Sequence, residues 1–177
     1  IVRLFIPRAA NQEITWINTN DATVYGVEFD FRKDLDFISP RLANFRFGMN
    51  FTYTYSEVAL DPEEYETLVK INPEINPTRP FNGQSPYLVN TMLNYQSDSL
   101  GLEMTLNLNV FGARLSEIGF NGVPDIYEQP RPMLNFNLIK DVGDRFQVKL
   151  GVSNILNAEF KKTQTFNNQE YITQLYQ

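Results

Sequence analysis

The feature that most constrains the fold is a series of segments in which apolar and polar residues alternate strictly. In the clearest segment, 101–111, every second position is apolar: Leu102, Met104, Leu106, Leu108 and Val110. The positions between them are polar: Glu103, Thr105, Asn107 and Asn109. Because successive side chains of a β-strand point to opposite faces, this segment predicts a strand with one apolar and one polar face. Such a strand fits a soluble sandwich or a membrane barrel.

Other segments repeat this pattern. Their apolar positions are Tyr25, Val27, Phe29 and Phe31; Phe45, Phe47, Met49, Phe51, Tyr53 and Tyr55; and Phe146, Val148, Leu150 and Val152. Weaker forms run over 87–95 and 134–138. The clean stretches are about 9–11 residues long, which is the length that a tilted strand needs to cross the hydrocarbon core of a bilayer. Strands of soluble sandwiches are shorter, at about 5–6 residues.

The connections between these segments are of two kinds. The short ones contain the glycine, aspartate or proline that turns favour: 34–44, 97–101 and 141–144. The long ones are 57–84, 114–131 and 157–168. Outer-membrane barrels have short turns on the periplasmic rim and long loops on the extracellular rim. The pattern therefore favours a membrane barrel over a soluble all-β domain.

The composition is compatible with a membrane barrel and excludes several other classes. The chain has no cysteine, so it has neither a disulfide framework nor a thiolate metal site. No apolar stretch approaches the ~20 residues of a membrane helix. The mean hydropathy of −0.32 fits strands that are half polar. The formal charge of −6 and a pI of about 4.7 argue against nucleic acid as a partner.

Aromatic residues near the expected strand ends allow two interpretations. Tyr25, Tyr55, Tyr87, Tyr95 and Phe111 occupy positions at which a barrel carries its interfacial girdle. Aromatic residues are also common in strands of any kind. The sequence alone leaves both interpretations open.

The residues that could carry chemistry do not predict an active site, and we expect that the chain is not an enzyme. It contains no histidine, so the standard general base near neutral pH is missing. Glu28 and Asp30 share a strand face, but Arg32 continues that face, so a solvated polar network is expected there. We predict no catalytic, cofactor-binding or metal-binding residue and no cofactor. The sequence does not identify ligand-binding residues.

The connection 57–84 contains an acidic cluster: Asp61, Glu63, Glu64 and Glu66. This cluster is either a cation or ligand site or part of a solvated loop, and we favour the loop. Proline-containing dipeptides further along the connection are expected to resist regular structure. Inside the predicted strands, Gly26 and Gly48 indicate bends or close approach of the backbone.

The alternation predicts about seven strands, at 1–6, 13–33, 43–57, 85–97, 101–113, 132–142 and 145–156, followed by a stub at 170–176. Segment 13–33 changes phase, because Ile14 and Trp16 are apolar at even positions and Tyr25 to Phe31 at odd ones. Either a hairpin turns at 18–21, or one strand continues through a bulge, which flips the alternation. A hairpin would place a short turn among the long loops, so we favour the single strand.

Residues 1–177 are expected to form one partial outer-membrane barrel domain. Bacterial single-chain barrels have even strand numbers, and open sheet edges in lipid leave backbone groups unpaired at several kcal/mol each. A closed eight-stranded barrel would need 1–6 to pair with 170–176, where the alternation is poor. We therefore expect a C-terminal part of a larger barrel, without a signal peptide, plug domain or closing strand.

Four stretches carry a family resemblance: Asn18 with 24–28, then 79–90, 109–114 and 152–157. Their sequences are Val24-Tyr25-Gly26-Val27-Glu28, Arg79-Pro80-Phe81-Asn82-Gly83-Gln84-Ser85-Pro86-Tyr87-Leu88-Val89-Asn90, Asn109-Val110-Phe111-Gly112-Ala113-Arg114 and Val152-Ser153-Asn154-Ile155-Leu156-Asn157. In this order and spacing they resemble the C-terminal barrel portion of TonB-dependent outer-membrane receptors of Bacteroidetes-type bacteria. The resemblance covers nearly the whole chain.

The resemblance implies an antiparallel up-and-down transmembrane β-barrel of 22 strands, plugged by an N-terminal domain, in a Gram-negative outer membrane. Such a receptor imports a scarce ligand with energy relayed by TonB, and its long loops are extracellular. The implied partners are outer-membrane lipid, the plug and remaining strands, TonB through the plug, and a surface lipoprotein. The alternatives are a passive porin-like channel and a structural barrel subunit of an envelope complex. No plug residue of the family has a matching position in this chain.

Overall fold

The computed structural model describes residues 2–7, 12–17, 21–71, 73, 75–119, 123–143, 145–166 and 169–176. These residues form mostly antiparallel β-sheet together with one α-helix, which confirms the predicted all-β class. No helix in this part of the chain is long and apolar enough to cross a membrane.

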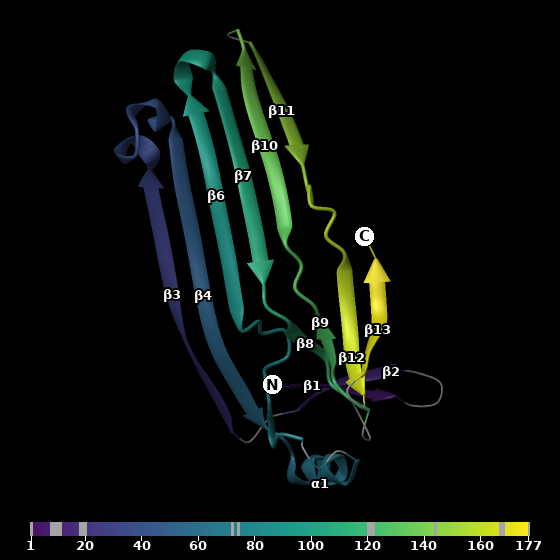
Figure 1. Cartoon of the computed structure of the whole chain (residues 1–177). Coiled ribbons are helices and arrows are strands. Elements are labelled where there is room, and N and C mark those ends of the chain that lie inside the picture. The colour runs from purple at the N-terminus through teal and green to yellow at the C-terminus, as the bar shows by residue number, and fades with distance from the viewer. Residues whose placement is uncertain are drawn as a thin grey trace.

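A sheet of long strands dominates the described structure, in which the strands lie side by side in one layer (Figure 1). In spatial order they are β11 (Phe146–Val152), β10 (Met133–Val142), β7 (Leu102–Phe111), β6 (Tyr87–Ser97), β4 (Phe45–Ala59) and β3 (Ala22–Asp34). A two-residue strand, β5 (Thr78–Arg79), pairs with the end of β4. All pairs are antiparallel, as the alternation predicts. Among the described residues this sheet is open, because β3 pairs with β4 alone and β11 with β10 alone.

The register of these strands gives the sheet two distinct faces. Asn50 lies opposite Asn90, and Asn90 lies opposite Asn109, so the polar positions of β4, β6 and β7 share one side. We call this side the polar face; it carries the even positions of β3, β4 and β6 and the odd positions of β7, β10 and β11. The remaining positions form the apolar face. The two-sided strand predicted for 101–111 is therefore confirmed and extends across the sheet.

Short and long connections lie at opposite ends of the sheet (Figure 1), as the sequence predicts. The turn end contains three 3₁₀ turns, η1 (Leu35–Phe37), η2 (Pro40–Leu42) and η3 (Asp98–Leu100), and the β10–β11 turn. Gly101 has φ of 54° and Gly143 has φ of 62°, a left-handed conformation that glycine adopts without strain. The other end, which we call the loop end, contains the long connections.

The long connections contain regular structure that the sequence analysis did not predict. Connection 57–84 contains the helix α1 (Pro62–Ile71), which was not expected. The proline-containing dipeptides lie beyond this helix, and the regular structure among their described residues is limited to the two-residue strand β5. Connection 114–131 contains β8 (Arg114–Glu117) and β9 (Ile126–Glu128), and 157–168 contains β12 (Phe160–Phe166). These three strands join β13 (Gln169–Tyr176) in a second sheet, in the order β13-β12-β9-β8.

The stub predicted at 170–176 is wrong, because these residues belong to the full strand β13. Lys162 pairs with Gln174 and Thr163 with Ile172, so the register skips Thr173. A bulge of this kind inverts the alternation on its two sides. The poor alternation thus marks a bulged strand. The eight-stranded pairing of 1–6 with 170–176 is not found in the described residues, where β13 pairs with β12.

The single strand predicted for 13–33 is also wrong. The strand β2 (Gln12–Ile17) pairs with β1 (Val2–Pro7) in a separate two-stranded sheet, whereas β3 pairs with β4. The change of apolar phase thus coincides with a change of partner, and strands with different partners need not share a phase. Of the turn considered at 18–21, only Asp21 lies within the described residues.

Burial is concentrated at the loop end. The buried hydrophobic residues of the described structure are Val58, Leu68, Leu115 and Ile118, which come from β4, α1 and β8 with its following residue. The apolar face of the main sheet is exposed by contrast, with Val27 at 67% and Phe146 at 72% of their full accessibility. Nothing in the described residues covers that face.

Close backbone approach is confirmed at one of the two strand glycines. A Cβ atom on Gly26 would lie 2.3 Å from the carbonyl oxygen of Tyr53. At Gly48 the nearest atom would be Cε of Met92 at 3.5 Å, which is ordinary van der Waals contact. The expectation of close approach is therefore wrong for Gly48.

Candidate functional site

The polar face is lined by a row of asparagines from neighbouring strands. Asn50, Asn90 and Asn109 lie in register across β4, β6 and β7, and Nδ2 of Asn109 donates to Oδ1 of Asn90 over 2.6 Å. A hollow of about 370 Å³ lies over this row and extends to Asn107 and Arg32. The row offers neutral groups that both donate and accept hydrogen bonds.

The charged residues of this face make further polar contacts. Nδ2 of Asn50 donates to Oε1 of Glu28 over 2.7 Å, and Nη2 of Arg32 lies 3.3 Å from Oδ2 of Asp30. Glu28, Asp30 and Arg32 thus make polar contacts on an exposed strand face. The Asp30–Arg32 pair is exposed, and exposed pairs contribute little to stability.

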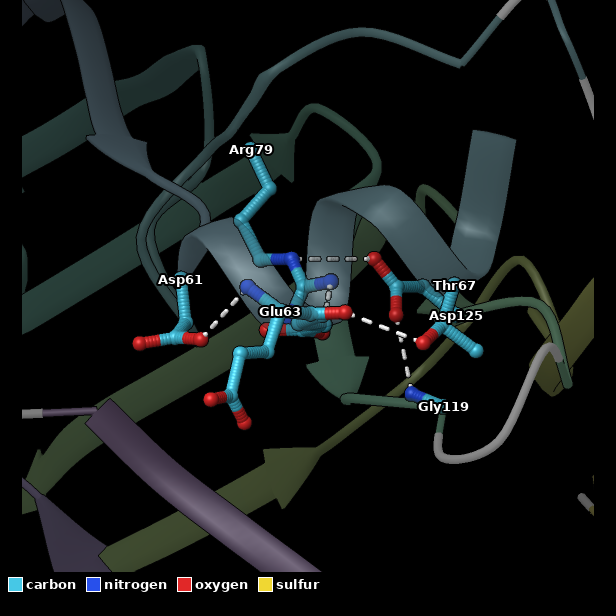
Figure 2. Close-up of polar contacts among 7 residues, drawn as sticks. Asp61, Glu63, Thr67, Arg79, Gly119 and Asp125 are labelled. Carbon is cyan, nitrogen blue, oxygen red and sulfur yellow. Dashed lines mark hydrogen bonds and ion pairs between the residues drawn. The ribbon is translucent and has the colours of Figure 1, made fainter. Parts of the chain in front are cut away.

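A second polar cluster lies at the loop end and centres on Arg79 of β5. Arg79 is only 8% exposed, and its Nη2 donates to Oε1 of Glu64 over 2.6 Å. Its Nε lies 3.6 Å from Oδ2 of Asp125, which is within range of an ion pair but too long for a hydrogen bond. That Nε has no hydrogen-bond partner among the described residues. Figure 2 shows the dashed contact between the guanidinium of Arg79 and the carboxylate of Asp125.

The helix α1 positions Glu64. The carboxylate of Asp61 accepts a hydrogen bond from the backbone N–H of Glu63 over 2.9 Å, and Pro62 occupies the first helical position. Both are typical of helix N-termini, and the acidic first turn suits the helix dipole. Glu64 and Leu68, one helical turn apart, therefore point the same way, towards the packed loop end.

The acidic residues 61–66 thus have divided roles. Asp61 caps the helix and Glu64 pairs with Arg79, whereas Glu63 and Glu66 are exposed. The favoured loop is wrong, because Glu63, Glu64 and Glu66 lie in α1, although Glu63 and Glu66 are solvated as expected. No group of three or more potential metal ligands occurs in the part of the chain that the structure describes.

Asp125 connects the cluster to the second sheet. Its Oδ1 accepts a hydrogen bond from the backbone N–H of Gly119 over 2.8 Å (Figure 2), and it directly precedes β9. Burial raises the pKa of the Tyr127 hydroxyl in β9, the charge of Asp125 raises it further, and the charge of Arg79 opposes both. Tyr127 is therefore neutral well beyond neutral pH.

Beside Arg79 lies a cavity of about 310 Å³. The pairing of β4 with β6 ends at Tyr53, and its pairing with β5 begins at Val58. Between these points, segment 80–86 contacts β4 through two hydrogen bonds: the N–H of Phe81 donates to Oγ of Ser56 over 3.3 Å, and the N–H of Thr54 donates to the carbonyl oxygen of Pro86 over 3.0 Å. The lining residues include Glu57, Asn76 and Gln84.

Ion pairs continue across the second sheet. Arg114 of β8 donates two hydrogen bonds, of 2.9 and 3.0 Å, to the carboxylate of Glu128 in β9. Nζ of Lys162 in β12 lies 2.8 Å from Oε1 of Glu117 in β8. The first pair joins two strands of connection 114–131, and the second joins that connection to 157–168.

Sequence reasoning missed the Arg79 cluster. The residues Asp61 and Pro62 followed by two glutamates are a helix N-terminal signal that could have located α1 and therefore Glu64. No sequence signal joins Arg79 to Asp125, because the contact depends on how two long connections pack together.

The chain has no match among known proteins by any of three comparisons. No protein-family model matches it, and no curated protein and no solved structure is significantly similar to it. The family resemblance therefore rests on the four sequence stretches alone and stays a prediction.

Proposed function

We propose that this chain forms part of the wall of an outer-membrane β-barrel receptor that takes up a ligand with energy relayed by TonB. The observation that carries the proposal is the uncovered apolar face of the main sheet. Its strands are mostly as long as a bilayer-spanning strand, and no second layer of the described structure covers its exposed Val27, Phe29, Phe146 and Leu150. A soluble protein rarely exposes an apolar patch of more than a few hundred Å². Lipid is the medium in which such a face is stable.

The distribution of charge on the apolar face supports a lipid contact. Within the six long strands, the charged residues on this face are Lys33 and Lys140 near the turn end and Glu57 near the loop end. The ammonium group of Lys140 donates to the carbonyl oxygen of Leu100 in the turn. Charged groups are tolerated near the interfaces and costly at mid-bilayer. The middle of the face is free of charge.

Aromatic pairs at both ends of the apolar face support the girdle interpretation. Tyr25 stacks on Tyr55 at the loop end with ring centroids 4.8 Å apart, and Phe45 meets Tyr95 at the turn end at 4.9 Å. Outer-membrane barrels carry aromatic girdles at the two interfaces. Phe111 differs, because the register places it on the polar face, where Arg114 lies 4.5 Å from its ring centroid.

The segregation of the connections supports an orientation. In outer-membrane barrels the short turns are periplasmic and the long loops extracellular. We propose that the turn end faces the periplasm and that α1 and the second sheet face outward. The polar face then lines the lumen, where its asparagine row meets water or the plug.

The four family-like stretches favour a receptor over the passive channel. A simple test is to determine the full-length open reading frame that encodes this chain. The receptor hypothesis predicts an upstream plug domain with a TonB-contacting segment. A frame that encodes the barrel without a plug would contradict the receptor and favour the porin-like alternative.

Surface labelling of intact cells tests the orientation in the full-length protein. A single cysteine at Glu66, which is exposed on α1, should react with a membrane-impermeant maleimide. A single cysteine at Ser99, which is exposed at the turn end, should react only after the outer membrane is permeabilised. The reverse pattern would contradict the orientation, and equal labelling of both would contradict a membrane-spanning sheet.

A further inference from the structure

We propose that Arg79 is a latch that holds the connections 57–84 and 114–131 together as one unit at the loop end. The latch is a conformational device built into the fold. The latch does not depend on the proposed function.

The first observation is the position of Arg79 between the two connections. Its partner Glu64 lies on α1, within 57–84, whereas Asp125 lies within 114–131. Because the Arg79 side chain is only 8% exposed, its charge is largely removed from water. A buried charge is strongly unfavourable when its partners leave, so the two carboxylates and the guanidinium are stable together or not at all.

The second observation is that further contacts join the same two connections. The N–H of Gly83 donates to the carbonyl oxygen of Leu115 over 2.7 Å, and Nδ2 of Asn82 donates to that of Ser116 over 3.0 Å. Leu68 of α1 and Leu115 of β8 are both buried at this end. These contacts make the two connections one packed unit.

The third observation is that the unit is attached to the main sheet over a short length. Beyond Tyr53, β4 contacts the chain on its β6 side through the hydrogen bond from the N–H of Thr54 to the carbonyl oxygen of Pro86, the bond between Phe81 and Ser56, and the pairing with the two residues of β5. The cavity of about 310 Å³ lies at this attachment and is lined in part by Arg79. Loss of the ion pairs would therefore let the two connections separate without disturbing the long strands.

The guanidinium is also incompletely satisfied in the closed arrangement. Its Nε lacks a hydrogen bond among the described residues, and the nearest Asp125 oxygen is 3.6 Å away. An arginine whose Nε and Nη groups all donated hydrogen bonds to the two carboxylates would hold the two connections more tightly. The arrangement is suited to a contact that opens.

Hydrogen exchange on the purified full-length protein in detergent micelles tests the latch. In Arg79→Met, exchange should become about tenfold or more faster in peptides that contain the amides of Gly83 and Gly119, because these report the contacts between and within the connections. Exchange in peptides from β6 and β7 should be unchanged. Glu64→Gln, which preserves the size of the side chain, should give a smaller change in the same peptides.

The matched control is Arg46→Met, which removes an exposed ion pair with Asp34 at the turn end. This variant should leave exchange at Gly83 and Gly119 unchanged. Unchanged exchange at these amides in Arg79→Met would overturn the latch, as would an equal rise throughout the long strands, which indicates general destabilisation. Because the readout involves neither ligand nor orientation, a failure of the latch is distinguishable from a failure of the proposed function.

Discussion

Leu93 and Leu106 are cross-strand partners on β6 and β7, and each keeps 37% of its surface accessible. One position further along, Nδ2 of Asn94 donates to Oγ1 of Thr105 over 3.0 Å on the opposite face. A leucine pair in a packed core would be almost fully buried. This pairing of an open apolar face with a hydrogen-bonded polar face is the basis of the proposed membrane location.

Leu106→Lys should destabilise the folded protein in a bilayer by about 2–4 kcal/mol, because it places a charge near mid-bilayer on the lipid face. The free energy of unfolding can be measured by urea titration in liposomes. Asn107→Lys is the matched control: it lies next in the strand on the polar face and should change the free energy little. Equal effects of the two substitutions would contradict the assignment of the faces.

Gly26→Ala should destabilise the sheet by about 1–3 kcal/mol, because its Cβ would meet the Tyr53 carbonyl at 2.3 Å and force the backbones apart. Gly48→Ala, with its nearest neighbour at 3.5 Å, should have a much smaller effect. The same unfolding titration compares the two. If Gly48→Ala is the more damaging, the register between β3 and β4 is incorrect.

The long strands could be predicted from the sequence because the alternation of apolar and polar residues is visible within each strand. It indicates that the two faces of the strand have different surroundings. The strands β4 and β7 have apolar residues at every second position in their central stretches, and the division of each strand into an apolar and a polar face follows from this. The turns could also be predicted from neighbouring residues, because Gly101 and Gly143 supply the left-handed conformation that each turn requires.

The loop end could not be predicted because its structure depends on contacts between distant segments. The strands β8 and β9 are short, and β9 takes β12 as its other partner from a different connection. In β13 the bulge at Thr173 conceals the alternation. In the sequence, Arg79 belongs to a turn-rich segment, whereas in the structure it is buried beside Glu64 and Asp125, which lie far from it in the chain. The helix itself was predictable from its capping residues and was missed.

The stability of the loop end should fall at alkaline pH through Tyr127. Its pKa is raised in the folded state, mainly by burial, above the ordinary value of 10.0. Above that pH the unfolded state loses a proton that the folded state keeps, so the stabilisation present below pH 10 declines as the pH rises through the folded-state pKa. The Tyr127→Phe variant has no phenolic hydroxyl and therefore no proton to lose in this pH range. The difference in unfolding free energy between wild type and Tyr127→Phe should therefore change above about pH 10, and a constant difference up to pH 11 would contradict the assignment.

The most direct test of the two-sided wall is a cysteine scan along β7 in the full-length protein reconstituted in lipid. A water-soluble maleimide should react quickly with cysteines at Thr105 and Asn107 and slowly with cysteines at Met104 and Leu106. A lipid-phase quencher should act in the reverse order on fluorophores at these positions. If Met104 and Leu106 react with the maleimide as fast as Thr105 and Asn107, the apolar face does not contact lipid and the proposed membrane wall is wrong.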